Sequence, residues 1–255
     1  MIIIVLHIVS GLLYPLLGTI IGSSFVFFMK KETQRSLMVF LDSFAAGVMC
    51  AASFFSLINP ACEAAQSQGD LSVLLCSVGF FSGMLIFVFV DKKLKDYSDK
   101  DSDVSGNMLL WAVSLHNIPE GMAVGVVYAG LLSMESDSDL AGAISLSIGI
   151  ALQNIPEGAI ISMPLKAKGK TRFKAFLCGM VSGIAEFVAA FLTLLIASVV
   201  HIILPFSLCF AAGAMFFVVL RELSFDFSSE KYCSFSLSVF ATGFTTMMLL
   251  DTLTG

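Results

Sequence analysis

The chain has 255 residues, of which 57% are hydrophobic and 13% are charged, and its formal net charge is −5. Soluble globular domains contain about 45–50% apolar and about 25% charged residues, so this chain has too few charges to solvate the surface of a soluble protein. The acidic balance offers no basic face for phosphates, which excludes a nucleic-acid-binding protein. The composition also excludes a disordered or fibrous chain. The sequence therefore predicts a polytopic membrane protein.

Eight segments have the roughly 20 mostly apolar residues that a transmembrane helix needs. Because backbone polar groups in lipid must be satisfied within the segment, runs of this length favour helices over a barrel. The first segment has no basic region or cleavage motif, so we expect a retained span and not a signal peptide. The short connections predict one domain over residues 1–255. The eight segments are 1–28, 37–59, 71–90, 107–130, 140–163, 174–199, 201–221 and 233–254.

Lys and Arg residues are confined to alternate connections between these segments. All 14 follow the first, third or fifth segment, or flank the turn between the seventh and eighth. The connections 60–70 and 131–139 carry none. Because cytoplasmic loops of membrane proteins are enriched in Lys and Arg, the sequence predicts that both termini are extracytoplasmic. The connection 91–106 is then a cytoplasmic loop.

Two short motifs occur twice, in segments that cross the membrane in opposite directions. The motif HNIPEG at 116–121 in the fourth segment recurs as QNIPEG at 153–158 in the fifth. The motif FAAGVM at 44–49 recurs as FAAGAM at 210–215, although this second repeat alone is a weak signal. Inverted repeats with proline-interrupted helices at matched positions are typical of secondary transporters, which bind their substrate near the bilayer midplane.

Three acidic residues lie well inside predicted spans: Glu120, Glu157 and Glu186 in the fourth, fifth and sixth segments. A carboxylate at the centre of a transmembrane helix costs from about 2.5 to more than 10 kcal/mol. No Lys or Arg lies deep in any segment to pair with these carboxylates. We therefore expect them either to be protonated or to share a cation.

Neighbouring polar residues favour the shared cation. His116 and Glu120 are four residues apart and so lie on one helix face, and Gln153 and Glu157 repeat that spacing. One imidazole, up to three carboxylates and amide oxygens form a mixed nitrogen and oxygen ligand set for a divalent first-row ion, without the thiolates typical of structural zinc sites. Two metal sites that share Glu120 or Glu157 as a bridge are compatible with this spacing.

Other functions use some of the same residues. A proton or alkali-cation pathway could use the three carboxylates, but it would not need the imidazole of His116. A membrane metalloprotease would need an HExxH motif, which the sequence lacks. A membrane di-iron oxidase would need many clustered histidines, whereas this chain has 3 that are far apart.

The 6 cysteines have no CxxC or zinc-ribbon spacing, and most of them lie in apolar segments. We interpret them as small core residues and expect no disulfide framework.

The motifs resemble those of the ZIP (Zrt-, Irt-like) divalent metal transporters, in particular the GufA/ZIP11-like branch. The resemblance covers nearly the whole chain and rests on HNIPEG, QNIPEG, GIAE at 183–186 and the stretch 44–60. It implies an all-α fold of eight transmembrane helices in a 3+2+3 inverted-repeat arrangement, and it suggests a homodimer. It also implies transport of zinc, with cadmium, iron or manganese as alternatives, across the plasma membrane into the cytoplasm, with no catalytic cofactor.

Carried over residue by residue, the resemblance implies a set of path residues. Asn154 stands where related proteins often have Asp, so we expect the second site to bind weakly or not at all. Arg221 stands where many members have His, and a cation there should discourage metal from resting at the exit. The implied residues are His116, Glu120, Gln153 and Glu157 for the primary site; Asn117, Asn154 and Glu186 for the second, bridged by Glu120 and Glu157; Ser56 and Glu63 for the entrance; and Asp91, Glu222 and Asp251 toward the cytoplasmic exit.

Overall fold

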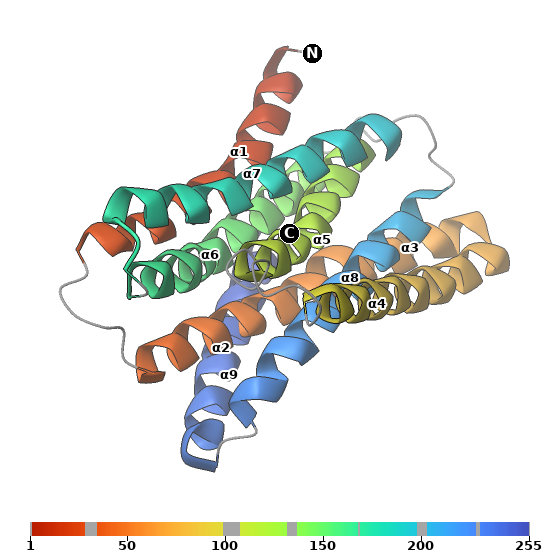
Figure 1. Ribbon diagram of the computed structural model, residues 1–255. Coiled ribbons are helices and arrows are strands. Elements are labelled where there is room, and N and C mark those ends of the chain that lie inside the picture. Colours follow the sequence, from red (N-terminus) through yellow and green to blue (C-terminus); the bar gives the residue numbers. More distant parts are fainter. Residues whose placement is uncertain are drawn as a thin grey trace.

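The computed structural model describes residues 2–28, 35–98, 108–131, 137–167, 169–197, 203–227 and 230–254 (Figure 1). Within these ranges the side chains at several helix ends, including those of 108–116 and 222–227, are outside the description. The described elements are all helical. They are α1 (Ile2–Ser24), the 3₁₀ turn η1 (Phe25–Phe27), α2 (Arg35–Ala52), the π-helical η2 (Ser53–Ile58), α3 (Asn59–Gln68), α4 (Asp70–Ser98), α5 (Met108–Leu131), α6 (Asp137–Ala167), α7 (Arg172–Ala197), α8 (Leu204–Phe227) and α9 (Glu230–Thr254).

Seven helices in the described part of the chain are long and apolar enough to cross a membrane. They correspond to seven of the eight predicted segments, and the predicted all-α polytopic membrane protein is confirmed. The remaining segment, 107–130, coincides with α5, whose side chains are described only from Asn117 onward.

The second predicted segment, 37–59, differs most from expectation. α2 passes into a π-helical turn at Ser53–Ile58 and then continues as α3 to Gln68, so the predicted connection 60–70 is largely helical. Pro60 is tolerated because it lies in the first turn of α3, where its missing N–H is not needed. Gly69 ends α3 with a φ of 98°, a left-handed conformation that glycine adopts readily.

One other boundary and two expected helix interruptions also differ from the sequence-based expectation. α4 continues to Ser98 and so covers part of the predicted loop 91–106, of which residues 99–106 lie outside the described ranges. α5 and α6 run through Pro119 and Pro156 as continuous helices, so the expected proline interruptions are not observed. Neighbouring helices in a membrane protein can satisfy the backbone groups that a proline frees.

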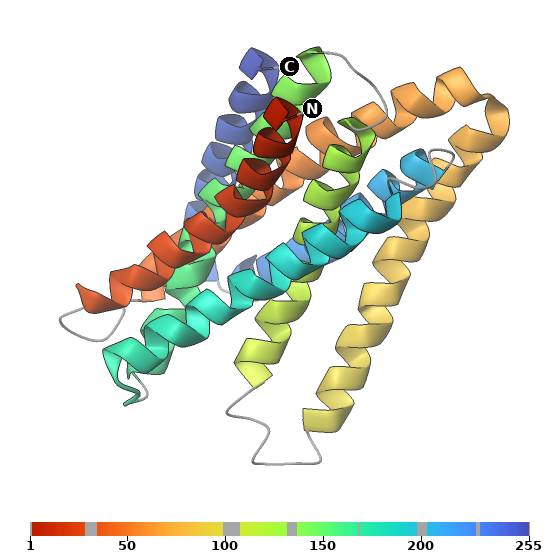
Figure 2. The ribbon, with the colours of Figure 1, turned by 90° about the horizontal axis from the view of Figure 1, so that it is seen from above.

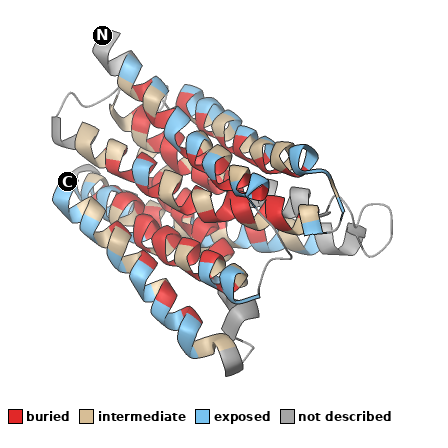
Figure 3. Cartoon of the chain, turned by 90° about the vertical axis from the view of Figure 1, so that its left-hand side faces the viewer, coloured by how far each residue is buried: buried red, intermediate tan, exposed pale blue. Residues whose placement is uncertain are grey.

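The helices pair in a symmetric pattern. α1 lies along α6, and α5 lies along α7; α2 lies along α9, and α4 lies along α8 (Figure 1). The start of α1 and the end of α9 lie toward one side of the molecule, and the end of α4 and the start of α5 lie toward the other (Figure 2). Buried residues line the surfaces between the helices, while exposed residues follow the outer faces (Figure 3).

Glycines allow α2 and α9 to approach each other closely. A Cβ on Gly47 of α2 would lie 2.2 Å from the carbonyl oxygen of Phe240, and a Cβ on Gly243 of α9 would lie 2.3 Å from that of Phe44. No side chain fits at those distances. Small residues commonly allow such close backbone contacts between transmembrane helices.

The contact between α8 and α4 repeats this arrangement. A Cβ on Gly213 of α8 would lie 2.0 Å from the carbonyl oxygen of Phe80, and a Cβ on Gly83 of α4 would lie 2.1 Å from that of Phe210. Equivalent residues are 166 apart for α2 and α8, and 160 apart for α4 and α9. The FAAGVM and FAAGAM motifs therefore occupy equivalent positions in an inverted repeat.

Candidate metal centre

Most of the predicted metal ligands lie on three neighbouring helices. α6 contacts both α5 and α7, and α5 lies along α7. His116 is on α5, but its side chain is outside the described residues. The six ligands with described side chains are all buried: Asn117 and Glu120 on α5, Gln153, Asn154 and Glu157 on α6, and Glu186 on α7.

The asparagines of the two repeated motifs tie their helices to outer neighbours. Asn117 Nδ2 donates to the carbonyl oxygen of Ser182 on α7 at 3.1 Å, and Asn154 Nδ2 donates to that of Pro15 on α1 at 3.1 Å. Because each NH₂ group is used in this way, the hydrogen-bond network assigns the orientation of both amides. Each Oδ1 atom is then buried and accepts no hydrogen bond from the described residues. Both amide oxygens are available as ligands.

Asn154 also links α6 to α7. Its Nδ2 donates to Glu186 Oε2 at 2.6 Å, whereas Glu186 Oε1 is buried and has no hydrogen-bond partner among the described residues. Glu157 lies close enough to Glu186 for the two carboxylate charges to repel each other. Burying two carboxylates that repel each other is less costly when protons or a cation neutralise them.

Glycines at the ends of the two motifs hold the helices in register. A Cβ on Gly121 would lie 2.2 Å from the carbonyl oxygen of Glu186, and a Cβ on Gly158 would lie 2.4 Å from that of Thr19. Glu186 and Thr19 are 167 residues apart, as are Ser182 and Pro15. α7 and α1 are therefore equivalent in the repeat, but α7 brings a carboxylate where α1 brings a hydroxyl.

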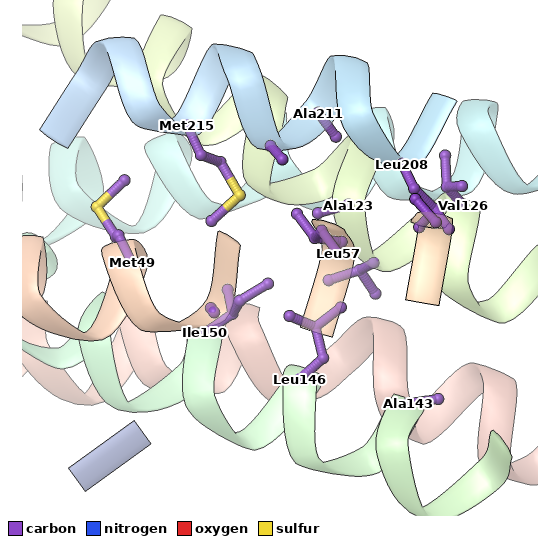
Figure 4. Close-up of a cluster of buried hydrophobic side chains, with 14 of the residues drawn as sticks. Met49, Leu57, Ala123, Val126, Ala143, Leu146, Ile150, Leu208, Ala211 and Met215 are labelled. Atoms are coloured by element: carbon purple, nitrogen blue, oxygen red, sulfur yellow. The ribbon is translucent and has the colours of Figure 1, made fainter. Parts of the chain in front are cut away.

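A cluster of buried apolar side chains fills the core between the helices (Figure 4). Leu146 and Ile150 of α6 pack in one cluster with Leu57 of η2 and with Ala123 of α5. In the orientation predicted from the Lys and Arg residues, this cluster lies on the outer side of Glu157. Apolar side chains offer no ligands to a hydrated ion, so the cluster separates the carboxylates from that side.

The primary ligand set remains a prediction. The amide of Gln153 is buried without a hydrogen bond to any described residue. Among the residues with described side chains, no group of three or more His, Cys, Asp and Glu residues has an arrangement that could hold a metal ion. His116, the expected nitrogen ligand, is outside that set, so its position relative to Glu120 and Glu157 is not described.

The expected entrance residues lie on the bent second segment. Ser56 Oγ of η2 donates to Asp251 Oδ1 of α9 at 2.7 Å, and Glu63 of α3 is exposed. The resemblance implied that Asp251 lies toward the cytoplasmic exit, but this contact places it beside Ser56, an expected entrance residue. α9 runs in the same direction as α2, so its last turns lie beside η2, and Asp251 lies apart from Asp91, the other expected exit residue with a described side chain.

The expected exit residues lie at the opposite ends of the helices. Asp91 of α4 forms an ion pair with Arg221 of α8, with 2.5 Å between Oδ1 and NH1. Glu222 follows on α8, but its side chain is outside the described residues. The carboxylate of Asp91 is therefore paired with the guanidinium of Arg221.

Three residues that the sequence did not single out hold the motifs in place. Pro15 and Thr19 of α1 contact Asn154 and Gly158, and Ser182 of α7 accepts the hydrogen bond from Asn117. Because all three contacts use backbone carbonyls, the side-chain identities of these residues carry no signal. The 167-residue spacing between α1 and α7 becomes visible only from the contacts.

A family model described as ZIP Zinc transporter matches residues 1–106 and 95–251 of this chain. The chain is 28% identical to zinc transporter ZIP11 of Xenopus tropicalis over 95% of this chain and 97% of that protein. It is 30% identical to zinc transporter ZIPB of Bordetella bronchiseptica, over 88% of this chain and 72% of that protein. It is 32% identical to zinc transporter ZupT of Chlorobaculum parvum, over 81% of each chain.

Proposed function

Because the chain belongs to the ZIP family of zinc transporters, we propose that it moves zinc across the membrane into the cytoplasm through a site on α5, α6 and α7. The relatives that it matches are named zinc transporters. The observation that carries the proposal is that Glu157 and Glu186, on the neighbouring helices α6 and α7, are both buried and repel each other, with Glu186 hydrogen-bonded to the amide of Asn154. A divalent cation between these carboxylates offsets the cost of burying them.

The primary site in this proposal consists of His116, Glu120, Gln153 and Glu157. His116 supplies the nitrogen ligand, the two carboxylates neutralise the ion, and Gln153 supplies a neutral oxygen. This mixed set suits zinc and other divalent first-row ions. A site without thiolates also suits a transporter, because the ion must leave again.

The second site consists of Asn117, Asn154 and Glu186, and it shares Glu120 and Glu157 with the first. We expect it to bind metal weakly, because the NH₂ group of Asn154 already donates to Glu186. That hydrogen bond leaves one oxygen on each residue, Asn154 Oδ1 and Glu186 Oε1, to bind an ion. An Asp at this position would add a charge and would not donate.

The direction of transport rests on the distribution of Lys and Arg, which predicts that the end holding Ser56 and Asp251 is extracytoplasmic. Residence in the plasma membrane and assembly as a homodimer are further parts of the proposal. Crosslinking of the protein in native membranes tests the homodimer, and fractionation of the membranes tests the location.

Zinc uptake into proteoliposomes that contain a zinc-sensitive dye tests the function. We expect saturable uptake by the unaltered protein and none by Glu157→Gln, which keeps the shape of the side chain but removes its charge. Ser238→Ala is the control, because Ser238 is exposed on α9 and bonds only within its own helix among the described contacts. Full zinc uptake by Glu157→Gln would contradict the site. Absence of zinc, cadmium, iron and manganese uptake by the unaltered protein would contradict the function.

A further inference from the structure

A buried serine pair ties α2 to α9. Ser43 Oγ and Ser236 Oγ are 2.6 Å apart and share a hydrogen bond. The repeat spacing of 166 residues places Cys209 of α8 at the position equivalent to Ser43, and the spacing of 160 places Cys76 of α4 at the position equivalent to Ser236. Cys76 and Cys209 do contact each other through their side chains. The thiol pair is thus the counterpart of the serine pair.

A third thiol, that of Cys62, interacts with this pair and has no counterpart in the serine pair. Cys76 Sγ lies 3.6 Å from the carbonyl oxygen of Ala61 on α3 and 4.0 Å from that of Pro205 on α8. Cys76 is therefore held between the turn of α3 that carries Cys62 and the turn of α8 that carries Cys209. Its side chain interacts with both of those thiols.

The three thiols differ in exposure. Cys62 is exposed, whereas Cys76 and Cys209 retain only 5% and 2% of their accessible surface. α3 and α4 form a hairpin around Gly69 at one end of the molecule (Figure 1). Cys62 and Cys76 lie on its two helices, and Cys209 lies near the start of α8. The Lys and Arg distribution predicts that this end is extracytoplasmic, and disulfides persist in extracytoplasmic, oxidising compartments.

We propose that Cys62 and Cys76 form a reversible disulfide that links α3 to α4, with a low-molecular-weight disulfide as the oxidant. The Cys62 thiolate attacks one sulfur of the oxidant RSSR, forms a mixed disulfide and releases RS⁻, which accepts the proton of Cys76. The Cys76 thiolate then attacks Cys62 Sγ and releases the second RS⁻. The two cysteines lose two electrons and two protons in total, and two molecules of RSH carry them away.

The pairing follows from accessibility. A reagent outside the membrane reaches the exposed Cys62 first, and Cys76 is the thiol in contact with it. Cys209 is only 2% exposed, and its side-chain hydrogen bond is with Cys76. Binding of a thiophilic metal by the three thiols is the competing use, but no described group of three such residues has metal-holding geometry.

Mass spectrometry of the full-length protein tests the disulfide. The protein is purified under reducing conditions, incubated with oxidised glutathione, labelled with N-ethylmaleimide and digested at low pH with pepsin. Pepsin is required because no Lys or Arg lies between Arg35 and Lys92, so trypsin leaves both cysteines in one peptide. We expect a peptide pair joined through Cys62 and Cys76, with Cys178 and Cys233 labelled, and reversal by dithiothreitol.

Cys62→Ser should abolish the linked pair, and this substitution is conservative and exposed, so it should not disturb folding. Cys178→Ser on α7 is the matched control and should retain the linked pair. A bond between Cys76 and Cys209, glutathione retained on Cys62, or complete labelling of all the thiols would each overturn the proposal. The assay reads a covalent bond and not metal transport, so its failure is distinct from failure of the proposed function.

Discussion

The two repeated motifs share five of their six residues but have different surroundings. On α5 the motif packs against α7 through Gly121, and on α6 it packs against α1 through Gly158. The backbone contacts and the asparagine hydrogen bonds match in the two halves. The polar groups do not match, because α7 supplies Glu186 where α1 supplies Thr19.

This comparison separates residues that hold the helices from residues that carry charge. The groups that are conserved between the repeats, namely the asparagines and glycines, fix the distances between helices. The groups that differ are Glu186 on α7 against Thr19 on α1 and His116 on α5 against Gln153 on α6, so the additional carboxylate and the imidazole both belong to the α5–α7 pair. Substitutions of matching residues should therefore have similar effects in the two halves, and substitutions of differing residues should not.

The largest effect is expected from the glycines of the motifs. Gly121→Ala and Gly158→Ala should each destabilise the protein by about 1–3 kcal/mol, since inserting a methylene into a packed core typically costs that much. In both cases the new Cβ would meet a backbone carbonyl that cannot rotate away. Thermal unfolding of the purified protein, followed by circular dichroism, measures the effect.

The matched control for both glycines is Gly142→Ala on α6, where a Cβ meets nothing within 4 Å. Alanine is the better helix former by about 1 kcal/mol, so this variant should be as stable as the unaltered protein or slightly more so. If Gly121→Ala and Gly158→Ala differed from each other as much as from this control, the two halves would not be equivalent supports.

The second effect concerns the residues that differ between the halves. Glu186→Gln should reduce zinc uptake by roughly tenfold, a loss typical of supporting groups around a metal. Thr19→Val on α1 should leave uptake nearly unchanged, because the Thr19 hydroxyl donates its hydrogen bond to the carbonyl oxygen of Pro15 in its own helix. Initial rates in the proteoliposome assay, corrected for the amount of reconstituted protein, give both values. Equal losses in the two variants would show that the halves do not differ in function.

Much of this arrangement follows from the sequence. The hydrophobic segments and the repeated motifs predicted an all-α membrane protein with an inverted repeat, because apolar length and motif identity are local properties. The continuation of the second segment through a π-helical turn into α3 was not predicted, since the polar sequence from Asn59 to Gln68 is typical of a loop. Helical hydrogen bonds and packing on α4 and α8 override that composition.

The candidate site was predictable in residue type but not in detail. Buried carboxylates are costly, so Glu120, Glu157 and Glu186 could be identified from their position in apolar segments alone. The anchoring of Asn154 to a backbone carbonyl could not be identified, because any residue of α1 provides such a carbonyl. The clustering of Cys62 with Cys76 also depends on how α3 folds back onto α4, which no short-range spacing encodes.

The smallest expected effect is a difference in coupling energy between the α4–α8 contact and the contact of η2 with α9. Asp91 and Asp251 are 160 residues apart and are therefore equivalent in α4 and α9, but Asp91 pairs with Arg221 while Asp251 accepts a hydrogen bond from Ser56. The side chains of Arg221 and Asp91 are 20% and 14% exposed, so their pairing is partly screened by solvent. A coupling of about 1 kcal/mol is expected, at the upper end of values for exposed pairs.

A double-mutant cycle measures this coupling from the stabilities of Arg221→Met, Asp91→Asn and the double variant. The same cycle with Ser56→Ala and Asp251→Asn should give about 0.6 kcal/mol, the mean for hydrogen bonds between transmembrane helices. Raising the salt concentration should weaken the first coupling more than the second, because only the first joins two opposite charges. Two equal couplings with equal salt dependence would mean that the guanidinium adds nothing to a neutral hydrogen bond. The contacts at the two ends of the repeat would then stabilise the protein equally.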